Sequence, residues 1–317
     1  MPPPTASSPA LNRSGLVLGT GAYLLWGFLP LYFQLLAPAR PVEIIAHRVV
    51  WSLVLCVTVL ALTRSLGTLR TVVRSPRTVV TLAGAGVLLT INWLVYVHGV
   101  LSGHTVDAAL GYYINPLVTV VIAIIVLGER LRRAQWAALV LGAASVLVIS
   151  IGVGRLPWIA LVLAATFGLY GLVKNRTGRT VGALTGLTVE TAAVTPLALG
   201  YLGWLTAQGV SSLGTEGTGH TAALVGLGAV TAVPLLLFAG AARRLPLSVV
   251  GLLQYLAPTL QFLIAVLVFH EEMPAARWWG FALVWLALAV LTVDGLRAGR
   301  PPGRRAPSPP QPMVRAR

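Results

Sequence analysis

The apolar residues of this chain gather into long runs that short polar segments separate. Each run holds about 20 residues, which is the length that an α-helix needs to cross the hydrocarbon core of a membrane. The alternation predicts an all-α polytopic membrane protein with ten membrane-spanning helices. The predicted helices cover residues 15–36, 42–63, 77–101, 105–127, 134–151, 156–174, 183–206, 220–241, 247–269 and 275–296.

One passage of the chain occurs twice. Tyr113 and Pro116 match Tyr255 and Pro258, which follow 142 positions later. A proline at the same depth of two long apolar runs indicates internal duplication, which is common among transporters. Pro116 and Pro258 each remove a backbone hydrogen bond in the middle of a span, so both are predicted to kink their helices.

The duplication divides the chain into two predicted domains, a first half over 15–151 and a second half over 156–296. Each half holds five spans. Because five is an odd number, the second half must cross the membrane in the direction opposite to the first. The sequence therefore predicts two inverted five-helix repeats, a scaffold that can open a central site to either side in turn.

Composition agrees with a bilayer environment. The chain of 317 residues is 56% hydrophobic and 10% charged, with a mean hydropathy of +0.84. This is too little polar surface to cover a soluble core of that size. The net charge of +15 would indicate nucleic-acid binding only if the basic residues shared a folded polar face. They lie instead in short loops between apolar runs, so the expected partner is the lipid bilayer and no nucleic acid.

The basic residues also predict the orientation. If the N-terminus is cytoplasmic, all the Lys and Arg residues lie in cytoplasmic segments except Arg40, Arg48, Arg155 and Arg277. Such a bias is typical of cytoplasmic loops, so both termini are predicted in the cytoplasm. The terminal segments 1–14 and 299–317 are polar or Pro-rich, and we expect both to be disordered.

The chain lacks the sequence motifs of several classes of nucleotide-binding protein and enzyme. There is no G-x-x-x-x-G-K-[ST] loop, and Lys174 is the only lysine, so we expect no ATP binding of the P-loop type. The histidines lack metal-ligand spacing, and neither H-E-x-x-H nor G-x-S-x-G occurs. Cys56 is the only cysteine. We therefore expect no catalytic residues, no metal and no cofactor, and the protein is not predicted to be an enzyme.

Two charged residues lie well inside predicted spans, away from their ends. Arg48 lies about six residues into the second span, where a charge costs on the order of 2.5–3.5 kcal/mol. It either binds the anionic part of a solute or holds the fold by pairing with Glu43 or with a helix C-terminus. Glu190 is the deepest acid. It carries a coupling proton, or it pairs with Arg48 or Lys174.

Four other acids lie near the ends of spans. Asp107 and Asp294 are expected to be solvated or to cap helices. Glu129 and Glu271 occupy matching positions of the duplication, which indicates a structural contact with a neighbouring loop rather than catalysis.

Amide and aromatic side chains complete a predicted solute-binding pocket. Asn92, Trp93 and Tyr96 fall at helical spacing in the third span, where residues three and four apart share a face. A second group precedes Pro116 in the fourth span. The full set of candidate pocket residues is Arg48, Asn92, Trp93, Tyr96, Tyr112, Tyr113, Asn115, Gln254, Tyr255, Trp26 and Tyr170, with Glu190 as the candidate for coupling.

These motifs, taken as a set, resemble the RarD branch of the EamA-domain proteins, within the drug/metabolite transporter superfamily. The resemblance rests on segments spread over about residues 15 to 296, in the same order. They are Tyr23 to Tyr32, Glu43 with His47 and Arg48, Trp51 and Ser52, Asn92 and Trp93, Leu110 to Leu117, Glu129 to Leu131, Phe167 to Leu172, and Gln254 to Thr259.

The resemblance implies ten helices in two inverted EamA halves, a plasma-membrane location and movement of small metabolites or drugs. The leading hypothesis is thus a secondary carrier that works by alternating access, with export favoured by analogy with the family. A homodimer is compatible with this hypothesis. The alternatives are a membrane scaffold or regulator that affects drug sensitivity without transport, and a membrane-embedded transferase, which the lack of a catalytic pair disfavours.

Overall fold

The computed structural model describes residues 12–128, 130–177 and 180–298. Glu129 and most of the predicted disordered segments 1–14 and 299–317 lie outside these residues. The first helix begins at Arg13, slightly before the predicted start at residue 15, because the side chain of Asn12 caps it by accepting a hydrogen bond from the Gly15 N–H (3.1 Å).

The regular structure of the described residues is helical. The first half contains α1 (Arg13–Gly27), α2 (Leu29–Gln34), α3 (Pro41–Leu62), α4 (Leu66–Val73), α5 (Pro76–Leu101), α6 (Thr105–Leu127) and α7 (Arg133–Val153). The second half contains α8 (Trp158–Thr177), α9 (Ala183–Ala207), α10 (Thr218–Ala242), α11 (Leu247–Leu253), α12 (Leu256–Leu263), the π-helical segment η1 (Ile264–Val268) and α13 (Ala275–Ala298).

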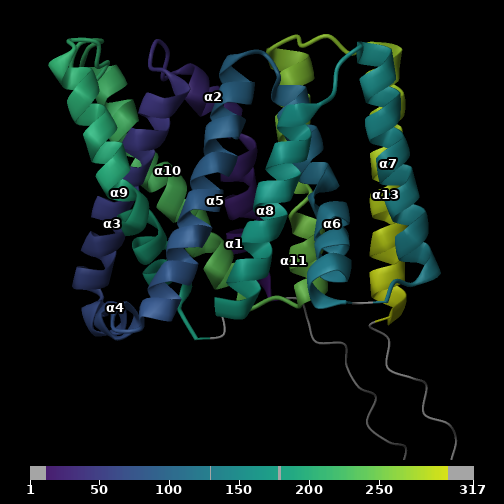
Figure 1. Cartoon of the computed structure of the whole chain (residues 1–317), viewed down its shortest axis with the longest axis horizontal. Coiled ribbons are helices and arrows are strands. Elements are labelled where there is room, and N and C mark those ends of the chain that lie inside the picture. Colours follow the sequence, from purple (N-terminus) through teal and green to yellow (C-terminus); the bar gives the residue numbers. More distant parts are fainter. Residues whose placement is uncertain (1–11, 129, 178–179, 299–317) are drawn as a thin grey trace, which may run out of the picture.

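The ten predicted spans are confirmed. Within the described residues, ten helical segments are long and apolar enough to cross a membrane. The first of these consists of α1 and α2 together, and the ninth is broken into α11, α12 and η1. Figure 1 shows the helices running roughly side by side between two ends of the bundle. We name the end where α1 begins and α13 finishes the terminal end, and the other the opposite end.

Local sequence sets several helix boundaries. Pro41 and Pro76 stand at the first positions of α3 and α5, where a missing N–H costs nothing. Gly128 and Gly154 follow α6 and α7 with φ values of 68° and 74°, a left-handed conformation that glycine adopts without strain. The short helix α4 between α3 and α5 was not predicted, because it is too short to give an apolar run.

The two repeated prolines behave differently. Pro116 lies within α6, whose helix continues past it. Pro258 lies in the first turn of α12, directly after the break between α11 and α12 at Gln254 and Tyr255. The ninth span is thus interrupted where the fourth is not, although both prolines were predicted to kink their helices.

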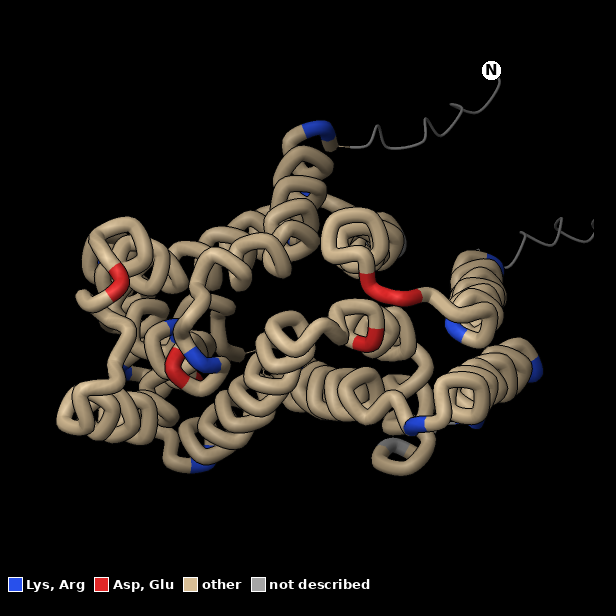
Figure 2. Tube along the Cα trace, turned by 90° about the horizontal axis from the view of Figure 1, so that it is seen from above, with Lys and Arg blue, Asp and Glu red and all other residues tan. Residues whose placement is uncertain are grey.

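Helix packing follows a scheme that stays the same when the two halves are exchanged. Helix α7 packs on α13, α3 on α9, and α6 on α12, each a pair of counterparts under the 142-residue offset. Other packed pairs of helices correspond to one another under the same offset. The α6–α8 pair corresponds to the α12–α1 pair, the α3–α10 pair to the α9–α5 pair, and the α1–α10 pair to the α8–α5 pair. Figures 1 and 2 both show α7 and α13 side by side at one edge of the bundle.

Charged side chains at the helix ends join neighbouring segments. At the terminal end, Arg132 forms an ion pair with Asp294 (2.8 Å). At the opposite end, Asp107 is 3% exposed and pairs with two arginines, Arg155 (3.1 Å) and Arg277 (3.4 Å). The expectation that Asp107 is solvated is therefore wrong. Its sequence position near a helix start gave no sign that loops from elsewhere in the chain cover it.

Candidate functional site

A cation lies buried within the helix bundle. Arg48, on α3, is 4% exposed, and the central carbon of its guanidinium group lies 3.9 Å from the ring centroid of Trp93 on α5. Its Nε is buried without a hydrogen-bond partner. Among the described residues, no carboxylate pairs with Arg48.

The expected structural partner of Arg48 is engaged elsewhere. The carboxylate of Glu43, one turn earlier on α3, accepts hydrogen bonds from the backbone N–H (2.7 Å) and the hydroxyl (2.9 Å) of Ser212 in the α9–α10 connection. Glu43 therefore anchors that connection to the start of α3. The interpretation of Arg48 as the ion-pair partner of Glu43 is wrong.

The Trp93 ring, which contacts the guanidinium group, belongs to a series of aromatic rings. The rings of Phe33, Trp93, Tyr96, Tyr112 and Phe167 follow one another edge to face, with centroids 5.5 to 6.2 Å apart. Tyr170 continues the series from Phe167 at 5.9 Å. We call Arg48, Asn92, Trp93, Tyr96, Tyr112, Phe167 and Tyr170 the central cluster.

Asn92 holds three helices together beside this cluster. Its Nδ2 donates to the Leu163 carbonyl (3.0 Å) and to the Thr166 hydroxyl (2.9 Å), both on α8. Its Oδ1 accepts from the Tyr112 hydroxyl (3.2 Å) on α6. Asn92 is 1% exposed, and these contacts orient the ring of Tyr112 toward the centre.

The buried acid Glu190 lies on α9 and is 1% exposed. One of its oxygens accepts a hydrogen bond from the Lys174 ammonium (2.7 Å), and the other accepts from the Tyr170 hydroxyl (3.2 Å). Of the two pairings left open by the sequence, the structure selects Lys174 over Arg48. Tyr170 therefore contacts Glu190 through its hydroxyl group and Phe167 of the central cluster through its ring.

Arg48 and Glu190 occupy equivalent places in the two halves. They are separated by the same 142 positions that relate Pro116 to Pro258. Each lies seven residues after the first residue of its helix, Pro41 for α3 and Ala183 for α9, and the two helices pack together. Helix α3 begins at the opposite end of the bundle and α9 at the terminal end (Figure 1), so the cation and the acid lie equally far along helices that run in opposite directions.

The remaining predicted pocket residues make other contacts. The Tyr113 hydroxyl forms a hydrogen bond with Thr259 (2.7 Å), and its ring contacts Phe281, in a cluster against which Tyr255 also packs. Trp26 contacts Tyr23 and Phe238, and its carbonyl accepts from Gln261. Gln254 is half-buried at the end of α11, and the buried Oδ1 of Asn115 has no partner among the described residues.

The structure adds two aromatic residues that were not among the candidates, Phe33 on α2 and Phe167 on α8. In the sequence, a phenylalanine in an apolar span looks like any other apolar residue. Only the structure shows that these two rings pack against the aromatic series. No group of three or more His, Cys, Asp or Glu side chains in the described part of the chain could hold a metal ion.

Known proteins are similar to this chain in sequence and in fold. The EamA-like transporter family matches residues 13–151. Protein RarD of Streptomyces exfoliatus is 50% identical over 289 residues, which is 91% of each chain. The chain belongs to the RarD branch of the EamA-like transporter family. An uncharacterised transporter of Pseudomonas aeruginosa is 44% identical and covers 94% of this chain and 98% of its own.

A solved crystal structure supports the fold independently. It aligns over 91% of this chain and 100% of its own, with a TM-score of 0.57 and 22% sequence identity. Together with the ten apolar helices, the family identifies a multi-pass membrane protein and a transporter of the drug/metabolite transporter type. The names of the relatives point to transport rather than to enzymatic chemistry.

Proposed function

We propose that this protein is a secondary carrier that exports small metabolites or drugs with an anionic group across the plasma membrane by alternating access. The observation that carries the proposal is the buried guanidinium group of Arg48, which has no acidic partner among the described residues. A buried charge without a counter-ion is costly, so a protein retains it where a ligand supplies the opposite charge.

The surroundings of Arg48 support a solute that is anionic at one point and planar or apolar elsewhere. The Trp93 ring covers one face of the guanidinium group and fixes its orientation through a cation–π contact, worth about 0.5–2 kcal/mol. The donor atoms of the guanidinium group can then meet a carboxylate or another oxyanion. The rings of Tyr96, Tyr112 and Phe167 offer edges and faces for the remainder of the solute.

The packing scheme supports alternating access. The pairing of helices stays the same when the halves are exchanged, as expected for two inverted five-helix repeats over 15–151 and 156–296. Counterparts Arg48 and Glu190 lie equally far along α3 and α9. If one half rocks against the other, the central cluster would be accessible first from one end of the bundle and then from the other.

We place the terminal end in the cytoplasm. The described arginines of that end, Arg64, Arg70, Arg74 and Arg77, lie in or beside α4, and others follow α6 and α10. The opposite end holds Arg40, Arg155 and Arg277, and Arg277 is engaged with Asp107. Cytoplasmic loops carry such an excess of basic residues. Export rather than uptake is the direction that we infer by analogy with the family.

Glu190 is the candidate for coupling transport to protons. Its two contacts, with Lys174 and Tyr170, link the terminal end to the central cluster. Protonation of this carboxylate would release Lys174 and loosen Tyr170. If Glu190 carries the coupling proton, transport by Glu190→Gln loses its dependence on pH; transport that keeps the pH dependence of the parent excludes the role.

The experiment that tests the proposed function is a thermal-shift screen of the purified protein with a panel of metabolites and antibiotics. A solute that binds the folded protein raises its melting temperature by mass action. We expect stabilisation by an anionic compound in the parent and none in Arg48→Gln. Arg40→Gln is the matched control, because it removes the same charge from an exposed position at the start of the same helix.

The two other outcomes contradict the proposal in different ways. If the same compound stabilises the parent and Arg48→Gln equally, the central cluster is not the binding site. If the compound fails to cross membrane vesicles that contain the parent, the protein acts without transport, as a scaffold or regulator would.

A further inference from the structure

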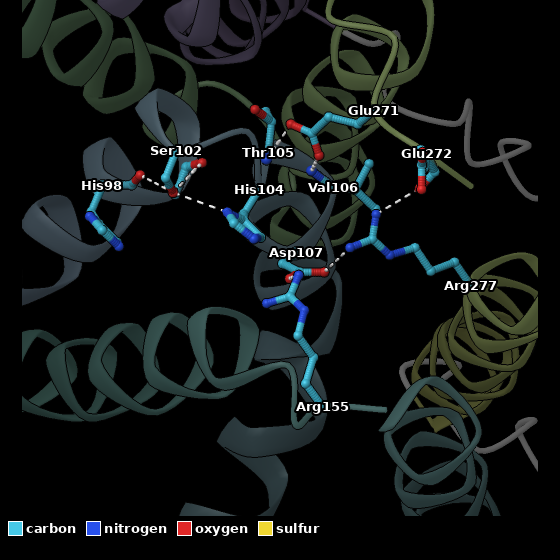
Figure 3. A network of polar contacts seen from close by, with 11 residues as sticks. His98, Ser102, His104, Thr105, Val106, Asp107, Arg155, Glu271, Glu272 and Arg277 are labelled. Atoms are coloured by element: carbon cyan, nitrogen blue, oxygen red, sulfur yellow. Dashed lines mark hydrogen bonds and ion pairs between the residues drawn. The ribbon is translucent and has the colours of Figure 1, made fainter. Parts of the chain in front are cut away.

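Four charged residues form a network at the opposite end of the bundle, at the start of α6. They are Asp107, Arg155, Glu271 and Arg277, and Figure 3 shows them converging from three separate segments of the chain. We call these four residues the opposite-end network. Their charges balance, with two acids and two arginines.

Glu271 caps α6 from the other half of the chain. The first N–H groups of a helix have no partner within the helix, and His104, at the cap position of α6, supplies no side-chain bond. The Glu271 carboxylate accepts from the backbone N–H groups of Thr105 (2.6 Å) and Val106 (2.9 Å). A carboxylate at this place also meets the positive end of the helix dipole, so the contact is favourable on two counts.

Asp107 receives the two arginines in the first turn of the same helix. Arg155, from the α7–α8 connection, donates to one carboxylate oxygen, and Arg277, on α13, lies beside the other. Arg277 also donates to the backbone carbonyl of Glu272 (2.7 Å), so it fixes the segment that carries Glu271. Asp107 and Arg277 are 3% and 7% exposed.

These contacts join the two halves at the start of α6. Asp107 and the start of α6 belong to the first half, and Glu271 and Arg277 belong to the second. At the terminal end, the ion pair of Arg132 with Asp294 also joins the halves, but its side chains are 48% and 17% exposed. Water screens an exposed ion pair and weakens the attraction between its charges. Buried charges that form hydrogen bonds interact more strongly.

We propose that the opposite-end network is the gate that closes the carrier at this end, and that it must break before the central cluster opens there. The proposal rests on the alternating-access carrier proposed above. Loss of the contacts with Glu271 and Arg277 would release the first turn of α6 from the segment and the helix that hold it, while the rest of α6 stays packed on α8 and α12. The network thus sets the equilibrium between the two accessible states.

A thiol reporter tests the gate without measuring transport. Ala109, on α6 just below the network, is fully buried in the cluster that includes Phe262 and Ala265 of the second half. In a Cys56→Ser background, Ala109→Cys should react slowly with a membrane-impermeant maleimide added to intact cells. We expect Glu271→Gln and Asp107→Asn each to raise the labelling rate by about tenfold or more, because hydrogen bonds to charged groups carry enough free energy for such a change.

Two controls separate gating from general loosening. Glu272→Gln changes the same charge at the adjacent residue, whose exposed side chain makes no hydrogen bond or ion pair among the described residues, so labelling should stay at the parent rate. The native Cys56, which is fully buried in α3, should stay unlabelled when Glu271→Gln is made without the reporter. Glu271→Asp, which keeps the charge on a shorter side chain, should give an intermediate rate.

The outcomes also distinguish the gate from the carrier function. Unchanged labelling in folded Glu271→Gln and Asp107→Asn, or an equal rise in Glu272→Gln, overturns the gate even if the parent transports solute. A selective rise in labelling supports the gate even where the solute screen finds no ligand. Should Asp107→Asn fold poorly, as a drop in monodisperse protein on gel filtration would reveal, Glu271→Gln and Glu271→Asp still decide the question.

Discussion

At the scale of single residues, the buried charges differ in whether the protein itself neutralises them. Glu43 is bound by Ser212, and Glu190 is bound by Lys174 and Tyr170. Arg48 has an aromatic neighbour but no counter-ion among the described residues. A buried ion that keeps its charge without a partner lowers the stability of the protein that contains it. This asymmetry is the reason to regard Arg48 as functional and the two acids as engaged.

The asymmetry predicts opposite effects of neutralising Arg48 and Glu190. Arg48→Met should raise the melting temperature of the solute-free protein, by the equivalent of about 1–4 kcal/mol, because an apolar side chain of similar length replaces an unpaired charge. Glu190→Gln should lower it, because Lys174 loses its ion-pair partner. Thermal unfolding in detergent measures both. A large loss of stability in Arg48→Met would show that Arg48 holds the fold.

A second prediction concerns the contact between Glu43 and Ser212. Ser212→Ala removes the hydroxyl donor of a buried carboxylate but leaves the backbone N–H in place. We expect a loss of stability of about 1.5–3 kcal/mol, the range for hydrogen bonds to charged groups. Ser211→Ala is the matched control, since the Ser211 hydroxyl accepts only a long hydrogen bond (3.3 Å) from Leu213 in the same connection. Equal effects of the two variants would contradict the assignment.

At the scale of helices, two glycines bring backbones into contact at equivalent places in the halves. A Cβ on Gly86 of α5 would collide with the Glu190 carbonyl of α9, and a Cβ on Gly228 of α10 would lie 2.5 Å from the Trp51 carbonyl of α3. The two glycines are again 142 positions apart. The close approach of α5 to α9 therefore depends on the missing side chain, and it places Glu190 beside the central cluster.

This packing predicts a contrast between two neighbouring glycines of α5. Gly86→Ala should lower the melting temperature and impair solute binding, because α5 and α9 must separate to admit the methyl group. Gly84→Ala, two residues away, meets no atom within 4 Å and should be neutral or stabilising by up to about 1 kcal/mol, the difference in helix propensity. Thermal unfolding of both variants checks the contrast, and a neutral Gly86→Ala would refute the close approach.

The helices also show how far the sequence could predict this molecule. Apolar runs of membrane-spanning length identify the ten spans, since the length is fixed by the bilayer. The same pattern cannot show which side of a helix faces the centre. Tyr112 and Tyr113 are both candidates by position, yet adjacent residues on a helix point about 100° apart. Only Tyr112 faces Asn92 and the central cluster, while Tyr113 faces Phe281.

Contacts between distant segments were the other part that the sequence could not supply. The acid Glu190 had two basic candidates, and only the structure shows that Lys174, near the end of α8, is the one that reaches it. Asp107 lies near a helix start and pairs with Arg155 of the α7–α8 connection and Arg277 of α13. Each of these residues stands out in the sequence as a charge in an apolar chain. Only the fold, however, shows which residue it pairs with.

At the scale of the whole molecule, the two ends of the bundle differ in charge and in how the halves are joined. The terminal end carries most of the described arginines and the exposed pair Arg132–Asp294, while the opposite end carries the buried network around Asp107. A gate buried at one end and a screened pair at the other are expected of a carrier that rests closed toward the outside. That interpretation requires the terminal end to lie in the cytoplasm.

The orientation predicts opposite labelling of two serines at the two ends. Ser65 precedes α4 at the terminal end, and Ser102 follows α5 at the opposite end. In a Cys56→Ser background, Ser102→Cys should react with a membrane-impermeant maleimide on intact cells, and Ser65→Cys should react only after the membrane is permeabilised. The change from Ser to Cys alters one atom, and Ser102 is exposed, so folding should be unaffected in both. Labelling of Ser65→Cys on intact cells would invert the orientation, and it would move the Asp107 network to the cytoplasmic side of the membrane.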